Sequence, residues 1–189
     1  MEAELYKNKY RIKTTRLADW DYSWPGFYYV TICTKNMVEY FGSVVNKKMV
    51  LNRMGCIVDG CWEEILKHFD FIELDEFVVM PNHVHGIIRI LCTNEDKGIN
   101  HVCRGVACNA STHERMSLIS PKHGSLASII RSFKSACTKE IRTKFPNKNF
   151  QWQSRYYDHI VKNQNDLDRV RNYIKLNPFN WQNEKCCYD

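Results

Sequence analysis

The sequence predicts a single α+β domain built on an antiparallel β-sheet. Two stretches with helical spacing of apolar residues separate runs rich in β-branched and aromatic residues, and the main elements follow the order β-α-β-β-α-β. The chain has 189 residues, which is long enough for one sizeable core. Its 8 glycines and 5 prolines are too few for a fibrous or low-complexity protein.

The first elements follow from local composition. Residues 1–24 are polar and basic with scattered aromatic residues, and we interpret them as an extended N-terminal arm. The run 27–34 (FYYVTICT) predicts a strand that is buried on both faces. Short runs at 41–45 and 49–52 predict a small hairpin. Apolar residues at helical spacing then predict a helix over 53–69.

The middle of the chain contains two further strands and an irregular segment. Strand-like runs at 72–80 and 83–91 flank Pro81, which has no backbone N–H and therefore belongs in a turn. Residues 92–123 show no periodicity, and we interpret them as a flexible insert. Helical spacing returns over 125–145.

The last elements complete the pattern. Residues 152–161 predict a strand, and Asn165 or Asp166 is expected to cap a C-terminal helix that Pro178 ends after about residue 177. This order is that of a ferredoxin-like βαββαβ fold, with an extra hairpin and a C-terminal helix. We expect the domain to span 25–181, followed by a tail at 182–189.

Positive charge gathers in the C-terminal half. Residues 120–175 contain twelve Lys or Arg and four Asp or Glu, a net of +8, whereas residues 53–79 have two basic and seven acidic residues, a net of −5. Aromatic residues are frequent in the basic half. This combination suits a nucleic-acid backbone and unstacked bases, and a solvated surface over an aromatic core is the other interpretation.

His83 and His85 stand at the start of a predicted central strand. Side chains alternate across a strand, so both imidazoles point to the same face. Two neighbouring imidazoles are suitable ligands for a divalent metal ion. Without a metal they are buried polar residues that need hydrogen-bond partners.

Tyr173 and Asn177 lie one helical turn apart in the C-terminal helix. The predicted buried stripe of this helix is Leu167, Val170 and Ile174, and the phenol and the carboxamide project together along its edge. A tyrosine at the edge of the core followed by a helix-capping asparagine is the alternative interpretation.

Four segments together resemble one known family. They are residues 20–34 (WDYSWPGFYYVTICT), 80–87 (MPNHVHGI), 152–159 (WQSRYYDH) and 173–178 (YIKLNP). In order and spacing they resemble the REP-associated tyrosine transposases, which are relatives of the single-tyrosine HUH transposases of insertion sequences. The resemblance runs from about residue 11 to residue 181, and 92–123 matches poorly.

The resemblance implies roles for four residues. His83 and His85 match the metal-binding histidines, Asn177 matches the amide that completes the metal site, and Tyr173 matches the nucleophile. It implies a Mg²⁺ or Mn²⁺ cofactor and a single-stranded hairpin DNA substrate. The implied reaction cleaves and rejoins DNA beside the hairpin through a 5′-phosphotyrosine intermediate. Relatives can exchange the tyrosine helix between subunits, so both a homodimer and a monomer are expected possibilities.

Further residues are candidates for supporting roles. The arm of the family contacts DNA, and here its candidates are Arg11, Lys13, Arg16, Trp20 and Trp24. Candidates for contacts with backbone phosphates are Lys134, Arg142, Arg155, Arg169 and Arg171. Asp158 and His159 are candidates for support of the metal or the tyrosine. Each of these residues also has an ordinary interpretation as packing or surface charge.

The insert holds potential zinc ligands without a zinc-module spacing: Cys92, His101, Cys103, Cys108 and His113. We interpret it as a loop with incidental cysteines. Nine cysteines without a disulfide pattern favour a reduced, cytoplasmic setting, and no segment is apolar enough for a membrane span. Two alternative functions remain at this point: a hairpin-binding protein that no longer cuts DNA, and a phosphohydrolase that uses the two histidines.

Overall fold

A four-stranded antiparallel sheet forms the centre of the computed structural model, which describes residues 20–91, 122 and 124–181. Its strands are β1 (Gly26–Cys33), β4 (Ile72–Val79), β5 (His83–Ile90) and β6 (Tyr157–Val161), in the order β4-β5-β1-β6. The predicted ferredoxin-like topology is therefore confirmed, with β5 and β1 at the centre.

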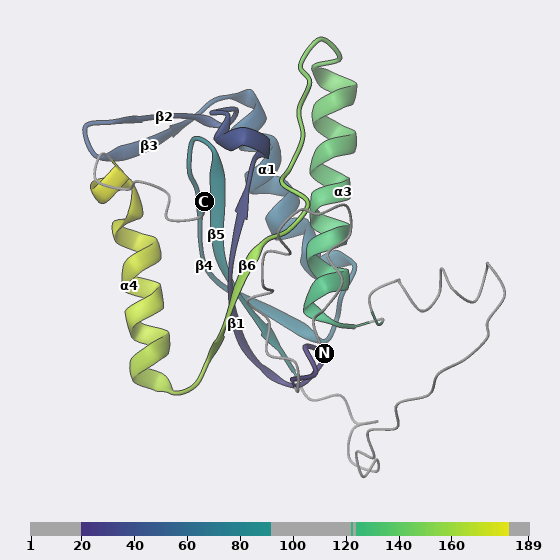
Figure 1. The fold of residues 1–189 in the computed structure, drawn as a ribbon, viewed down its shortest axis with the longest axis vertical. Coiled ribbons are helices and arrows are strands. Elements are labelled where there is room, and N and C mark those ends of the chain that lie inside the picture. The colour runs from purple at the N-terminus through teal and green to yellow at the C-terminus, as the bar shows by residue number, and fades with distance from the viewer. Residues whose placement is uncertain (1–19, 92–121, 123, 182–189) are drawn as a thin grey trace, which may run out of the picture.

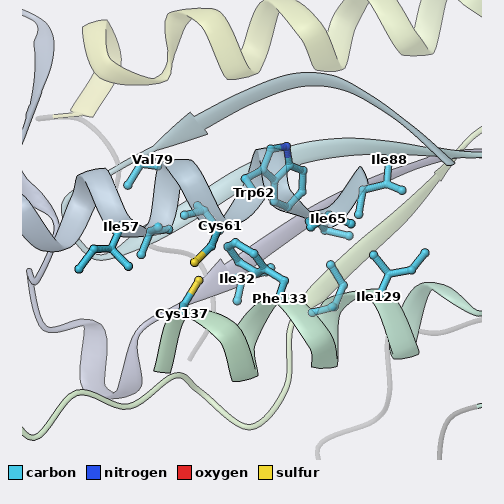
Figure 2. Close-up of a cluster of buried hydrophobic side chains, with 14 of the residues drawn as sticks. Ile32, Ile57, Cys61, Trp62, Ile65, Val79, Ile88, Ile129, Phe133 and Cys137 are labelled. Carbon is cyan, nitrogen blue, oxygen red and sulfur yellow. The ribbon is translucent and has the colours of Figure 1, made fainter. Parts of the chain in front are cut away.

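Two helices cover one face of the sheet (Figure 1). They are α1 (Arg53–Glu63), which continues into the short 3₁₀ helix η3 (Glu64–Lys67), and α3 (Leu126–Lys144). Alternate residues of β1, Tyr28, Val30 and Ile32, point into the core beneath them. Figure 2 shows how side chains of α1 and α3 meet in this core. This layer contributes most of the buried apolar surface.

The opposite face of the sheet carries α4 (Gln164–Asn180), as Figure 1 shows. A smaller cluster joins Leu167, Val170 and Ile174 of α4 to Tyr29 and Ile87 of the sheet. The separate hairpin of β2 (Gly42–Val45) and β3 (Lys48–Leu51) reaches the C-terminal end of α4, where the Lys47 ammonium lies 3.8 Å from the centre of the Phe179 ring. A short 3₁₀ helix, η2 (Lys35–Met37), follows β1.

Among the boundaries that differ from the predictions, three concern the last strand and the last helix. The last strand begins at Tyr157, because Trp152 makes only an isolated bridge to Thr34. Asn163, rather than Asn165 or Asp166, caps α4: its side-chain oxygen accepts the backbone N–H of Asp166 at 2.9 Å.

Pro178 does not end α4, which continues to Asn180. A proline in the last turn removes one helical hydrogen bond. The contacts of Phe179 with Lys47, and of Trp181 with the ring of His83, support this last turn.

The close packing of β5 against α1 gives a first test of the fold. A Cβ atom added at Gly86 would lie 2.3 Å from Trp62 Cζ2, and Trp62 is buried and stacked on Phe77 with ring centres 4.4 Å apart. We expect Gly86→Ala to lower the free energy of unfolding by about 1–3 kcal/mol, as overpacking does elsewhere. Gly60→Ala in α1 is the matched control, because nothing lies within 4 Å of its added Cβ. Chemical denaturation of both variants measures the effect, and equal stabilities would contradict this packing.

Candidate active site

His83 and His85 lie side by side on the face of the sheet that α4 covers. Their partners in β1 are Cys33 and Thr31, and both imidazoles are buried, with 2% and 3% of their surfaces exposed. The two Nε2 atoms face each other at 2.9 Å. The structure therefore brings the two imidazoles together, as alternation along the strand predicts.

The Nδ1 atoms of both histidines have partners within the chain. The amide nitrogen of Asn82 donates to the carbonyl of Met37, so its Oδ1 faces His83 Nδ1 at 2.7 Å and accepts the proton there. The Nδ1 atom of His85 lies 2.8 Å from the Tyr29 hydroxyl and 2.9 Å from Thr31 Oγ1. These contacts hold both rings with their Nε2 atoms turned toward the shared space.

Burial keeps both imidazoles neutral. It lowers the pKa of His83 from 6.5 to about 4, although a hydrogen bond with Asn177 partly opposes this shift. Burial also lowers the pKa of His85 well below 6.5, and repulsion from the neighbouring His83, when that ring is protonated, lowers it further. Neutral imidazole is the form that binds metal ions, so the pair is ready for that role at neutral pH.

The lowered pKa of His83 predicts acid sensitivity of the fold. Between pH 6.5 and 4 the unfolded chain binds a proton at this residue that the folded chain does not, so stability falls as the pH drops through this window. From pH 6.5 to 5 the loss amounts to about 2 kcal/mol for this group. Between pH 6.5 and 5 we expect the free energy of unfolding of His83→Gln to fall by about 2 kcal/mol less than that of wild type. Urea unfolding in EDTA measures both proteins. An identical pH dependence in the two proteins would contradict the buried neutral state.

Helix α4 brings Tyr173 and Asn177 to the histidines. The apolar side chains of α4 pack on the sheet and so determine which side of the helix faces it. Asn177 lies along that side, with 1% of its surface exposed. The Tyr173 ring packs edge-on against His85, with ring centres 5.3 Å apart, and 43% of its surface is exposed. The site thus combines two imidazoles, a buried amide and a phenol that solvent or substrate can reach.

The donor set fits a divalent cation. Adjacent ligands of an octahedral ion at about 2.1 Å stand about 3 Å apart, close to the 2.9 Å between the two Nε2 atoms. The amide of Asn177 bonds with His83 and so lies beside the pair. These three residues supply three ligand atoms, so an octahedral ion held there would keep positions for oxygen ligands. The described residues contain no group of three or more His, Cys, Asp or Glu side chains that could hold a metal ion.

Asp158 and His159 lie away from these four side chains. Asp158 pairs with Val30 and faces the α1–α3 core, on the opposite side of the sheet from His85. His159 shares the face of His85, but its Nε2 binds Asp166 Oδ2 at 2.8 Å. Asp166 precedes Tyr173 by seven residues, which is about 10 Å along a helix.

Part of the predicted DNA-binding set is described, whereas Arg11, Lys13 and Arg16 lie outside the described residues. Trp20 packs edge-on against Trp24, and its indole donates to the Tyr28 hydroxyl at 3.1 Å. The Lys134 ammonium donates to the carbonyls of Gln153 and Arg155 at 2.7 and 3.0 Å. Burial lowers the pKa of Lys134 to about 8.

The three predicted phosphate-contacting arginines of α3 and α4 have partners within the chain. Arg142 donates to the carbonyl of Phe150, Arg169 pairs with Asp166, and Arg171 pairs with Asp75 and Asp168. Arg155 is exposed in the segment that precedes β6. The contacts of Lys134 and Arg171 support the fold, and their contribution to DNA binding stays a prediction.

The predicted zinc candidates of the insert, Cys92, His101, Cys103, Cys108 and His113, lie outside the described residues. The described helices include none with the length and apolar character of a membrane span.

Sequence reasoning missed the residues that orient the imidazoles. The composition of residues 27–34 predicts only a buried strand, yet the hydroxyl groups of Tyr29 and Thr31 both contact His85. Asn82 directly precedes the first histidine and holds it from the other side. The available signal was the polar hydroxyl at every second position of an otherwise apolar strand.

Known proteins match the chain in sequence and in fold. The family model described as "Transposase IS200 like" matches residues 102–177, which include Tyr173 and Asn177. An uncharacterized protein of Haemophilus influenzae is 36% identical over 183 residues, which cover 94% of this chain and 93% of the relative.

Two solved structures match the chain over most of its length. A REP-associated tyrosine transposase bound to a REP hairpin superposes with a TM-score of 0.54 at 15% identity, over 90% of this chain and 74% of that one. A putative transposase from Deinococcus radiodurans gives a TM-score of 0.41 at 14% identity, over 87% of this chain and 96% of its own. The family model and the sequence relative show the family: the chain belongs to the IS200-like transposases.

Proposed function

We propose that the protein is a metal-dependent transposase that cleaves and rejoins single-stranded DNA next to hairpins of the REP type. The observation that carries this proposal is the position of Tyr173, an exposed phenol with its ring 5.3 Å from that of His85, in a site that also holds His83 and Asn177. A phenol beside a neutral pair of metal-binding imidazoles suits nucleophilic attack on a phosphodiester.

In the proposed cleavage step, Tyr173 Oη attacks the scissile phosphorus and loses its proton. A bond forms between this oxygen and the phosphorus, while the bond from phosphorus to the 3′ oxygen breaks. The 3′ oxygen leaves and takes up a proton, which gives a free 3′-OH and a DNA 5′ end attached to Tyr173. Attack by another 3′-OH reverses these steps and joins the strands, so the covalent bond conserves the energy that rejoining needs.

His83, His85 and Asn177 are proposed to hold Mg²⁺ or Mn²⁺. When bound there, the cation would polarise the non-bridging oxygens of the scissile phosphate. Both imidazoles and the amide are neutral, so the substrate phosphate supplies the balancing negative charge. Asn82, Tyr29 and Thr31 keep the imidazoles in place for this role.

The proposed partner is a hairpin with single-stranded flanks. The related structure of similar fold is bound to a REP hairpin, and residues 120–175 of this chain carry a net charge of +8. One chain supplies His83, His85, Tyr173 and Asn177, so a monomer can hold a complete site, and a homodimer remains the other form to test. We place the reaction in the cytoplasm, because the nine cysteines without a disulfide pattern favour a reducing setting.

A cleavage assay tests the proposal. The protein is mixed with Mn²⁺ and labelled single-stranded oligonucleotides that carry the inverted repeats flanking its own gene. We expect a protein–DNA adduct that survives denaturation and a released strand with a free 3′-OH. Hairpin binding without any adduct would support the second candidate, a hairpin-binding protein that does not cut.

Binding should depend strongly on salt. We expect single-stranded hairpin DNA to bind more tightly than blunt duplex, because the basic segment can neutralise phosphates while its aromatic residues stack on unpaired bases. Contact with about four phosphates gives a slope near −3 in a plot of log affinity against log salt. Titrations between about 50 and 200 mM salt measure this slope. Equal affinity for duplex, or a flat response, would contradict the proposed mode of binding.

A further inference from the structure

Strand β4 contains a bulge that turns two consecutive acidic residues toward α4. Leu74 pairs with Ile88 and Phe77 pairs with Gly86, so Asp75 and Glu76 together lie opposite Ile87. In a regular strand two neighbouring side chains point to opposite faces, whereas in a bulge both can point to the same face. Leu74 and Phe77, on either side, both pack in the core beneath α1 and α3.

Each acidic residue pairs with a basic residue of α4. Arg171 binds Asp75 through two bonds, from Nε to Oδ1 at 2.9 Å and from Nη2 to Oδ2 at 2.5 Å. The Lys175 ammonium lies 2.7 Å from Glu76 Oε1. Arg171 and Lys175 are one helical turn apart, so both pairs hold the same edge of the helix. We call these four residues the α4 clamp.

The Arg171–Asp75 pair is the stronger half of the clamp. Its side chains are partly covered, with exposed fractions of 31% and 18%, whereas those of Lys175 and Glu76 are 56% and 31%. The two hydrogen bonds from Arg171 lower the pKa of Asp75, so both groups are charged at neutral pH. A two-point bond between a guanidinium and a carboxylate fixes orientation as well as distance.

In the sequence, Tyr173 lies between Arg171 and Lys175. On the helix, it lies near the edge opposite to these two residues. Of the four buried side chains of α4, Leu167, Val170 and Ile174 are apolar, so their contacts have no preferred direction. The fourth, Asn177, bonds with His83 on the edge of the helix opposite the clamp, so it does not hold the clamp edge. Side-chain tips lie about 5–6 Å from a helix axis, so a rotation of about 10° moves a tip by about 1 Å. Such a displacement can cost about a hundredfold in rate.

We propose that Asp75, Glu76, Arg171 and Lys175 are positioning residues that fix the rotation of α4 on the sheet and thereby aim Tyr173 at the site of His83 and His85. This inference rests on the proposed function of Tyr173. It gives Arg171, predicted from the sequence as a DNA contact, a different role: its charge acts on Asp75 within the protein.

The test separates DNA binding from cleavage. Arg171→Met removes the stronger pair altogether. Asp75→Asn removes the negative charge and the bond from Arg171 Nη2 to Oδ2, and it keeps Oδ1, which accepts from the backbone N–H of Glu76 and from Arg171 Nε. We expect cleavage at saturating hairpin DNA to slow by about tenfold to a hundredfold, with hairpin affinity changed less than about twofold. Arg171→Lys keeps the positive charge and should retain part of the rate that Arg171→Met loses. The double variant Asp75→Arg with Arg171→Asp exchanges the two charges and should also recover part of the lost rate.

The matched control is the Arg89–Glu73 pair. It also joins β4 to a basic residue at 2.9 Å, but its partner lies in β5 rather than α4. We expect Arg89→Met to leave both the cleavage rate and the hairpin affinity unchanged. Weakened hairpin binding by Arg171→Met, with an unchanged rate at saturation, would overturn the inference and make Arg171 a phosphate contact.

A measurement without DNA distinguishes this inference from the proposed function. Hydrogen exchange of the α4 amides in the free protein should be faster in Asp75→Asn than in wild type, and unchanged in Arg89→Met. Unchanged exchange in Asp75→Asn, together with unchanged cleavage, would refute the clamp. Faster exchange in a protein whose wild type forms no adduct would refute the proposed function and leave the anchoring of α4 standing.

Discussion

Tyr173→Phe is expected to abolish the covalent protein–DNA adduct and, with it, DNA cleavage. The substitution removes the one oxygen proposed to attack the phosphorus and keeps the ring that packs edge-on against His85 and Tyr29. Because 43% of the Tyr173 surface is exposed, its loss of a hydroxyl should change the free energy of unfolding by less than about 0.5 kcal/mol. Cleavage should fall by at least about a thousandfold, as when other covalent nucleophiles are removed. Denaturing gels of a labelled hairpin substrate measure both products.

The matched control for this experiment is Tyr156→Phe. Tyr156 packs against the core on the other face of the sheet, with its ring 5.8 Å from the Lys134 ammonium. We expect this variant to cleave as wild type does. Peptide mapping of the adduct gives a second readout, since it identifies the attached residue directly. An adduct in Tyr173→Phe, or one that maps to Tyr156 or Tyr157, would show that the nucleophile is another tyrosine even if the reaction is as proposed.

The arrangement of the four central side chains could be predicted because it depends only on local periodicity and topology. Alternation along a strand places His83 and His85 on the same face wherever that strand lies. The helical repeat places Tyr173 and Asn177 on one edge. The order of elements makes β5 a central strand, and the apolar stripe of α4 turns that edge toward it. The family resemblance added the proposed roles, which the geometry accommodates.

The hydrogen bonds around the histidines could not be predicted in the same way. The contact of Tyr29 and Thr31 with His85 depends on the register between β1 and β5, which the sequence of either strand leaves open. The α4 clamp depends on the bulge at Asp75 and Glu76, and nothing in a run of alternating residues marks where an extra residue enters. Both features arise from pairings between distant segments of the chain.

The end of α4 illustrates a tertiary effect on a local rule. Proline is a strong signal for the end of a helix, and the prediction of an end near residue 177 followed it. The structure continues the helix through Pro178 to Asn180, where Phe179 and Trp181 contact Lys47 and His83. Local propensity could not include these contacts, because Lys47 and His83 belong to distant elements.

Removal of either histidine is expected to abolish cleavage while hairpin binding survives. His83→Ala and His85→Ala each take away one of two imidazole ligands proposed for the divalent cation, so cleavage should fall by at least about a thousandfold, equivalent to about 4 kcal/mol of transition-state stabilisation. EDTA should have the same effect on wild type, and added Mg²⁺ or Mn²⁺ should reverse it. Asn177→Ala should give a weaker enzyme that recovers at high Mn²⁺, because both imidazoles remain.

Calorimetric titration with Mn²⁺ in the absence of DNA supplies a readout that does not depend on cleavage. Wild type should bind one ion, and His83→Ala and His85→Ala should lose this binding. His68→Ala is the matched control, since His68 is exposed beyond the end of η3 and lies outside the site. Because both imidazoles are buried, thermal melts must show that each variant is folded before its activity is compared. Cleavage that persists in EDTA, or Mn²⁺ binding that survives the loss of both histidines, would remove the metal from this site and with it the proposed role of the pair.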